Sequence, residues 1–231
     1  MNEGLQTYPG ASGAGSLASQ QSRVLRNTYW LLALSMVPTV LGAWVGVSTG
    51  IMATLGSGMS LVVFLVGAFG FMFAIEKTKE SAAGVGVLLA FTFFMGLMLS
   101  RLLAAILGFS NGASLIMTAF GGTALVFFGM ASLASVIKRD LSGMGKFLIV
   151  GALIIFAAGL INFFVQSSAL MLTLSVLCIG LFSAFMVYDI KRVIDGGETN
   201  YISATLAIYL DVYNVFQSLL AILGIFGGER D

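Results

Sequence analysis

Residues 181–214, LFSAFMVYDIKRVIDGGETNYISATLAIYLDVYN, decide the fold of this chain. Two long apolar runs meet here across a short charged connection, and each run carries one acid, Asp189 in the first and Asp211 in the second. On insertion scales an Asp at the centre of a membrane helix costs about 2.5–3.5 kcal/mol, so such residues usually face a partner, a cavity or an ion path. The stretch therefore predicts two antiparallel membrane helices, and the two acids are the first candidates for a functional site.

The whole chain has the composition of a membrane protein. Of its 231 residues, 58% are hydrophobic and 9% are charged, whereas a soluble domain carries roughly 25% charged residues. Seven stretches are close to the ~20 apolar residues that cross ~30 Å of hydrocarbon. They are continuously apolar rather than alternating, which indicates helices and not a barrel. We place them at residues 28–49, 57–76, 82–107, 113–137, 147–165, 169–190 and 202–226. The expected fold is all-α, a single bundle of seven transmembrane helices over residues 28–226.

The ends of the chain and the distribution of its charges predict how the bundle is oriented. Residues 1–27 are rich in Gly, Ser, Ala and Gln and have few large apolar residues, so we expect a disordered tail. Residues 227–231 form a short tail at the other end. Nine of the eleven Lys and Arg residues fall on one side: Arg23, Arg26, Lys77, Lys79, Lys138, Arg139, Lys146, Lys191 and Arg192. The positive-inside rule then predicts a cytoplasmic amino terminus and an external carboxyl terminus.

Several classes of site are excluded by the residues that the chain lacks. It has no histidine, which excludes Ser–His and Cys–His catalysis, HExxH zinc sites and imidazole-based pH sensing. The single cysteine, Cys178, lies in an apolar stretch and is interpreted as a small buried hydrophobic residue. A net charge of +1 gives no sign of nucleic-acid binding.

Enzymes of the membrane interior are also a poor match. Tyr188–Asp189 is similar to the first motif of intramembrane aspartyl proteases, but the glycines that should precede the second acid are replaced by Ile208–Tyr209–Leu210 before Asp211. A retinal protein needs a lysine in its last helix, and residues 202–226 contain none. We therefore expect no catalysis, no metal site and no cofactor.

Polar residues continue along the last apolar stretch. Asn214 and Ser218 follow Asp211 at i+3 and i+7, so the three share one helix face. Two interpretations stay open. The stripe orients the helix through interhelical hydrogen bonds, or Asp189 and Asp211 share a proton and line an ion path, since two neighbouring carboxylates cannot both ionise cheaply. The second interpretation predicts a pH switch built from carboxyl groups.

Small residues and one buried cation complete the pattern. Gly42 and Gly46 form a GxxxG pair that predicts close helix packing. The same role is expected of three glycines in the fourth stretch: Gly121, Gly122 and Gly129. Arg101 lies about six residues from the outer end of the third stretch, where its long side chain can reach the headgroups or pair with a carboxylate.

Four sequence blocks occur in an order that is typical of one protein family. They are VLRNTY (24–29), GGTALVFF (121–128), GGETNYI (196–202) and YNVFQSLLAILG (213–224). With these blocks the chain resembles the Bax inhibitor-1 family over nearly all of residues 24–226. The resemblance implies six helices around a central seventh, in the bacterial inner membrane. The branch that the chain resembles most associates with FtsH, a membrane-anchored ATP-dependent protease. Such proteins restrain FtsH and are slowly processed by it through a cytoplasmic amino-terminal tail.

A second bacterial branch of this family is described as a pH-sensitive calcium leak. Asp189 and Asp211 match its pair of acids on helices six and seven. In the leak proteins a basic residue near the end of helix two is linked to that pair, and the candidates here are Lys77 and Lys79. The resemblance therefore implies calcium or protons, in addition to membrane lipids, as partners in the alternative function.

Overall fold

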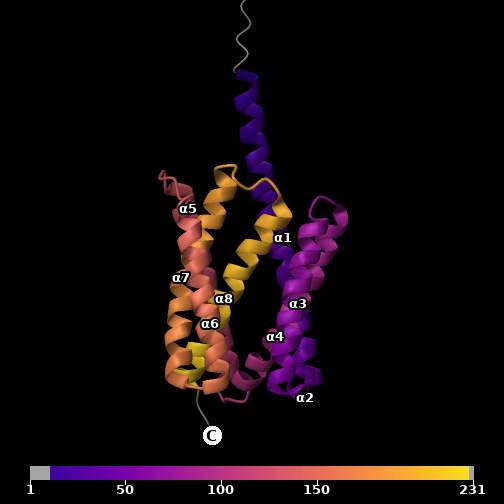
Figure 1. Ribbon diagram of the computed structural model, residues 1–231, viewed down its shortest axis with the longest axis vertical. Helices are drawn as coiled ribbons and strands as arrows, with labels where there is room; N and C mark the ends of the chain where they lie inside the picture. The colour runs from indigo at the N-terminus through magenta and orange to yellow at the C-terminus, as the bar shows by residue number, and fades with distance from the viewer. Residues whose placement is uncertain (1–10, 229–231) are drawn as a thin grey trace, which may run out of the picture.

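The computed structural model of the protein describes residues 11–228, with side chains from Ser19 onward, and all regular structure in that range is helical (Figure 1). The helices are α1 (Ala11–Thr49), α2 (Ile51–Thr54), α3 (Gly56–Thr78), α4 (Ala82–Leu107), α5 (Gly112–Val136), α6 (Met144–Val165), α7 (Ser168–Ile194) and α8 (Tyr201–Gly227). Seven of them are long and apolar enough to cross a membrane, and α2 is a single turn. The prediction of a seven-helix membrane bundle is confirmed, and apart from the start of α1 the boundaries agree to within a few residues.

Local sequence signals set the ends of the last two helices. The hydroxyl of Ser167 accepts a hydrogen bond from the backbone N–H of Leu170 and caps α7. The side-chain oxygen of Asn200 accepts from the N–H groups of Ile202 and Ser203 and caps α8. Between α7 and α8 the chain turns at Gly196, whose φ of 78° lies in the left-handed region that glycine adopts without strain.

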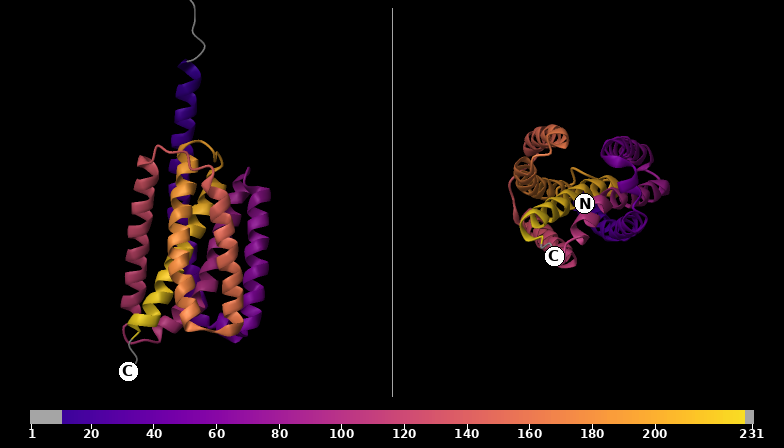
Figure 2. Two further views of the ribbon diagram at one scale, coloured as in Figure 1. Left: turned by 60° about the vertical axis from the view of Figure 1, so that its left-hand side comes forward. Right: turned by 90° about the horizontal axis from the view of Figure 1, so that it is seen from below.

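The bundle has two chemically different ends (Figure 1). The α3–α4, α5–α6 and α7–α8 connections lie at the same end as the start of α1. We call this end, which carries Lys79, Lys138, Arg139, Lys191 and Arg192, the basic end, and the other the opposite end. α8 runs the whole way between them and finishes at the opposite end (Figure 2, left). The charge asymmetry expected from the sequence is therefore built into the fold.

The amino-terminal part of the chain differs from the expected disordered tail. α1 begins at Ala11, so residues 11–27 continue the helix that crosses the membrane, whose apolar span starts at Ser19. This part of α1 projects beyond the other helices (Figures 1 and 2). Residues 11–27 contain no proline and join an existing helix directly, and a helix that is already nucleated propagates more easily than a new one forms. Residues 1–10 and 229–231 of the two expected tails lie outside the described residues.

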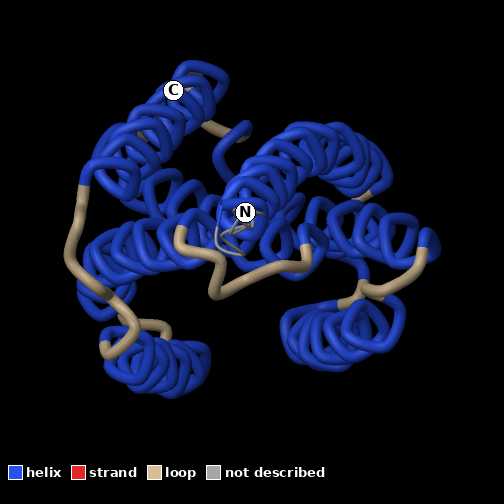
Figure 3. The backbone as a smooth tube through the Cα atoms, turned by 90° about the horizontal axis from the view of Figure 1, so that it is seen from above, coloured by secondary structure: helices blue, strands red, loops and turns tan. Residues whose placement is uncertain are grey.

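α8 is the central helix of the bundle. It packs against α7, α5, α1, α4 and, to a small extent, α3, and it passes between the other helices in the views along the bundle axis (Figure 2, right; Figure 3). α6 is the exception to the expected ring of six, because it packs on α7 and not on α8 or α3. Its outer position leaves one side of the bundle open between α3 and α6.

The most extensive helix pair is α1 with α4, and glycines bring the two backbones together. A side-chain carbon on Gly42 would collide with the carbonyl of Phe93, and one on Gly96 with the carbonyl of Thr39. Gly46 lies equally close to Ser100, which confirms the GxxxG prediction. In α5, by contrast, nothing lies near Gly121 or Gly129, and only Gly122 meets a neighbour, Leu219. For Gly121 and Gly129 the packing prediction is wrong, because both face away from the bundle.

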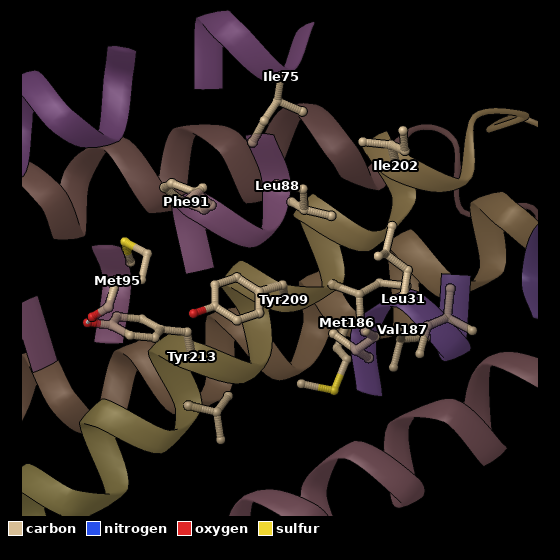
Figure 4. Close-up of a cluster of buried hydrophobic side chains, with 14 of the residues drawn as sticks. Leu31, Ile75, Leu88, Phe91, Met95, Met186, Val187, Ile202, Tyr209 and Tyr213 are labelled. Carbon is tan, nitrogen blue, oxygen red and sulfur yellow. Dashed lines mark hydrogen bonds between the residues drawn. The ribbon is translucent and has the colours of Figure 1, made fainter. Parts of the chain in front are cut away.

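A cluster of fully buried apolar side chains fills the space around α8. Leu88 and Phe91 of α4, Met186 of α7 and Ile208 of α8 have no exposed surface. In Figure 4 the ring of Tyr209 lies among these side chains, 6.1 Å from the ring of Phe91 in an edge-on arrangement. This cluster holds α8 in place at the level of Asp189 and Asp211.

Candidate functional site

The structure brings Asp189 of α7 and Asp211 of α8 together. Their carboxyl groups are close enough for each to act on the other. Asp211 is only 3% exposed, whereas Asp189, nearer the basic end, is partly exposed. Two neighbouring carboxylates cannot both ionise cheaply. The arrangement therefore favours a pair in which one acid keeps its proton.

The inner member of the pair is incompletely satisfied. Oδ2 of Asp211 is buried and has no hydrogen-bond partner, the sole such side-chain atom found in the described part of the chain. Buried polar atoms are nearly always paired, so an orphan at this position indicates strain, a functional group or a site for a small polar species. Within the described residues, no group of three or more acids and cysteines is placed to hold a metal ion.

The charged residues around Asp189 come from the start of the α7–α8 connection. Arg192, one turn further along α7, and Glu198 both act on Asp189 electrostatically. The guanidinium of Arg192 donates to the carboxylate of Glu198 at 3.2 Å. Among the described residues, Arg192 is thus the basic residue that acts on the acid pair. Arg192 follows Asp189 by three residues in YDIKR, and this spacing, which places the two on one helix face, is the signal in the sequence that indicates their proximity.

The two lysines expected as latch residues have other partners. Lys77 stacks over the ring of Phe73, with its Nζ 5.4 Å from the ring centroid. Lys79 pairs with Glu76 at 2.6 Å, and this hydrogen bond raises the pKa of the lysine. Neither lysine contacts Asp189 or Asp211 among the described interactions, so the structure gives a latch at these positions no support.

The three polar residues predicted to share one face of α8, Asp211, Asn214 and Ser218, do not all interact with the same helix. Ser218 is buried and lies near Cys178 of α7, an arrangement that the sequence did not reveal. Asn214 is half-buried and donates to the carbonyl of Leu210 in its own helix at 2.8 Å. Asp211 and Ser218 therefore face α7, whereas Asn214 is satisfied within α8.

Two tyrosines fix the opposite face of α8. The hydroxyl of Tyr209 bonds to the hydroxyl of Thr39 on α1 at 2.9 Å, and the hydroxyl of Tyr213 donates to the carbonyl of Met95 on α4 at 3.2 Å. Figure 4 shows both rings directed toward α4. The roles of these tyrosines were not predictable, because nothing in the sequence says which face of α8 meets which helix. By fixing this face of α8 against α1 and α4, they hold Asp211, which lies on the other face, against α7.

Asn200 ties the loop after α7 to the loop between α3 and α4. Its Nδ2 donates to the carbonyl of Lys79 at 2.9 Å and to Oε1 of Glu80 at 3.1 Å, while its own backbone N–H donates to Glu198. The GGETNYI block is thus a connector between α3, α7 and α8 at the basic end.

Comparison with known proteins assigns the chain to a family. The profile of the family described as inhibitor of apoptosis-promoting Bax1 matches residues 21–228. An uncharacterized protein of Pseudomonas aeruginosa is 39% identical over 208 residues, which cover 90% of this chain and 91% of that protein. An uncharacterized membrane protein of Vibrio cholerae is 38% identical, with 91% and 92% covered. The protein of Escherichia coli K12 that is named modulator of FtsH protease YccA is 38% identical over 202 residues, with 87% and 90% covered. This chain therefore belongs to the Bax inhibitor-1 family.

Proposed function

We propose that this chain is a multi-pass protein of the bacterial inner membrane that restrains the FtsH protease and is itself a slowly processed client. The observation that carries the proposal is the 38% identity to the Escherichia coli modulator of FtsH along nearly the full length of both chains. A second Escherichia coli relative at the same identity is named an inner membrane protein. On this proposal the basic end faces the cytoplasm, as the distribution of Lys and Arg predicts.

The shape of α1 supports a role as a client. Its first turns project past the bundle (Figure 1), and the side chains of Ser19, Gln20, Ser22 and Arg23 are mostly exposed there. A protease that draws substrates in from one end requires such an accessible segment. The rest of α1 is held tightly against α4 through Gly42 and Gly96, which opposes extraction.

Removing residues 2–20 tests this proposal, because the deletion takes away the projecting part and leaves the span almost intact. We expect a longer half-life in cells that contain FtsH and weaker copurification with FtsH. The matched control removes residues 229–231 at the other end and should leave both unchanged. Restraint is measured separately, as the rate at which purified FtsH degrades a second membrane substrate with and without this chain. An unchanged half-life together with no effect on that rate would refute the proposal.

The acid pair supports a second candidate function, a pH-dependent leak for calcium or protons. Its basis is the contact between Asp189 and Asp211 and the unpartnered Oδ2 of Asp211. When the shared proton is lost, the two like charges repel in a medium of low dielectric. That repulsion favours separation of α7 and α8 and opens a path at Asp211.

The leak is tested by calcium and proton flux into proteoliposomes at pH 6 and pH 8. Asp211→Asn keeps the shape of the side chain, and its amide can donate permanently to Asp189. We therefore expect the flux of this variant to be the same at both pH values, while the wild type conducts more at pH 8. Asp195→Asn is the control, because Asp195 pairs with Lys191 outside the acid pair. Equal fluxes of wild type and Asp211→Asn at both pH values would eliminate the leak.

A further inference from the structure

A cleft of about 220 Å³ opens on the side of the bundle between α3 and α6. α6 packs only on α7, and Met98 and Arg101 of α4 together with Tyr213 and Gln217 of α8 form the floor of the cleft. Seen along the bundle axis, the ribbons of α3 and α6 lie apart (Figure 2, right). Leu61 and Phe64 of α3 and Phe163 of α6 give the cleft apolar walls. The cleft lies toward the opposite end, since Ser57 in the first turn of α3 and Met52 of α2 line it as well.

Arg101 of α4 places a charge at the outer edge of this cleft. It lies six residues before the end of α4, about 9 Å from that end at 1.5 Å per residue. The side chain extends to the first turn of α3, where its Nη2 donates to the hydroxyl of Ser57 at 2.7 Å. The guanidinium therefore reaches the depth at which α3 begins, which is the depth of the lipid headgroups.

Arg101 has no negative partner in the part of the chain that the structure describes. The ion pairs found there join residues of the basic end, and among the described residues Ser57 is the one hydrogen-bond partner of a guanidinium that has five N–H donors. The amide of Gln217 on α8 also lines the cleft, is exposed, and has no hydrogen-bond partner among the described residues. A cation and an amide thus face a cleft whose other lining residues are apolar side chains and three that carry hydroxyl groups, Ser57, Ser60 and Tyr213.

We propose that this cleft is a binding site for one anionic phospholipid, with the phosphate at Arg101 and an acyl chain along Leu61, Phe64 and Phe163. Arginine matches phosphate with paired N–H donors, and it is more weakly hydrated than lysine at such a site. The amide of Gln217 can donate to an ester carbonyl below the phosphate. The cleft thus offers a cation, an amide and apolar side chains. A phospholipid carries the matching groups in the same order, a charged head, polar esters and an apolar tail, and the open side of the cleft faces the bilayer.

Adjacent phenylalanines of α6 provide a reporter and its control at the same depth. Phe163 lines the cleft, whereas Phe164 is 80% exposed and faces lipid. Phe163→Trp and Phe164→Trp are prepared in the full chain carrying Trp30→Phe and Trp44→Phe, which removes the native tryptophans. Each reporter is reconstituted in phosphatidylcholine vesicles that contain either brominated phosphatidylglycerol or brominated phosphatidylcholine at the same fraction. Quenching then measures which lipid contacts the tryptophan.

The Phe163→Trp reporter should show a preference of about fivefold for brominated phosphatidylglycerol, the size expected of one basic residue near a membrane surface. Arg101→Gln should abolish the preference and Arg101→Lys should retain most of it. The Phe164→Trp reporter should be quenched equally by both lipids in every variant, and this equality also shows that Arg101→Gln is folded and inserted. Equal quenching of the Phe163→Trp reporter by both lipids, a preference that survives Arg101→Gln, or its loss on adding inorganic phosphate would overturn the proposal.

Discussion

Asp211 is held at the α7–α8 interface by residues on the far side of its own helix. The hydroxyls of Tyr209 and Tyr213 bond to α1 and α4, and these bonds fix the rotation of α8 about its axis. The carboxyl group has therefore little freedom to turn away from Asp189. A costly acid is kept inside the bundle by two phenols that have no contact with it.

Tyr209→Phe tests this arrangement at the level of one atom. The change removes the hydroxyl that bonds to Thr39 and keeps the ring beside Phe91. Interhelical hydrogen bonds in membranes contribute about 0.6 kcal/mol on average, so we expect a decrease of that size in the free energy of unfolding, measured by SDS titration. Tyr29→Phe is the control, because Tyr29 keeps its ring contact with Phe127 and has no hydroxyl bond among the described residues. A Tyr209→Phe protein as stable as wild type would mean that the ring alone orients α8.

At the basic end, the loops between helices are linked to one another as well as to the helices that they join. The amide of Asn200 both caps α8 and joins the α3–α4 loop through Lys79 and Glu80. Because α7 precedes this residue and carries Asp189, the position of one acid is coupled to the loop after α3. The GGETNYI block is therefore a structural tie at the end where the acid pair is most accessible.

Two substitutions of Asn200 distinguish its role as the N-cap of α8 from its hydrogen bonds to the α3–α4 loop. Asn200→Ala removes both and should lower the free energy of unfolding by about 1 kcal/mol, the usual contribution of an N-cap. Asn200→Asp keeps the cap, but it loses the donor to Lys79 and places a negative charge beside Glu80.

The readout for the tie is the rate of trypsin cleavage after Lys79. We expect Asn200→Asp to accelerate this cleavage while leaving stability closer to wild type than Asn200→Ala does. Thr199→Ala, at an exposed neighbouring position, serves as the control. Cleavage of Asn200→Asp at the wild-type rate would show that the loop is held by other contacts.

The extent of most helices could be predicted from the sequence, but which helices pack against one another could not. In lipid a helix face that meets other helices and one that meets acyl chains are equally apolar, so hydropathy reports span and not burial. α6 shows this clearly: its most apolar window has a mean hydropathy of 2.6 and is 6% buried, whereas α8 has 1.6 and is 44% buried. The contact of Asp189 with Asp211 was predictable because α7 and α8 are antiparallel and joined by a short loop. The proximity of Cys178 to Ser218 was not, since it depends on how the two helices are rotated about their axes, whereas Arg192 follows Asp189 by three residues on the same helix.

At the scale of the whole molecule the bundle is asymmetric. α1, α4 and α8 form a tightly packed unit with α5 and α7, while α3 and α6 are each attached mainly through one helix, α4 and α7 respectively. The open side between α3 and α6 is therefore the part of the bundle with the fewest constraints.

Spin-label distances should reveal this asymmetry. With Cys178→Ala as background, labels at Val66 of α3 and Leu153 of α6, both exposed to lipid, should give a broad distance distribution by double electron–electron resonance. A control pair at Val40 of α1 and Ala90 of α4 should give a narrow one, because glycines lock these helices together. Distributions of equal width would show that α3 and α6 are as firmly seated as the rest.

The continuity of α1 from Ala11 to Thr49 has a mechanical consequence. A pull on Ala11 passes along one helix into the membrane, where the backbone of Gly42 lies close to the carbonyl of Phe93 in α4. The α1–α4 interface is the most extensive helix pair of the bundle, and it therefore bears the force as sliding along its whole length rather than as separation of one turn after another. A force on that end meets the resistance of this interface before any other helix pair is loaded.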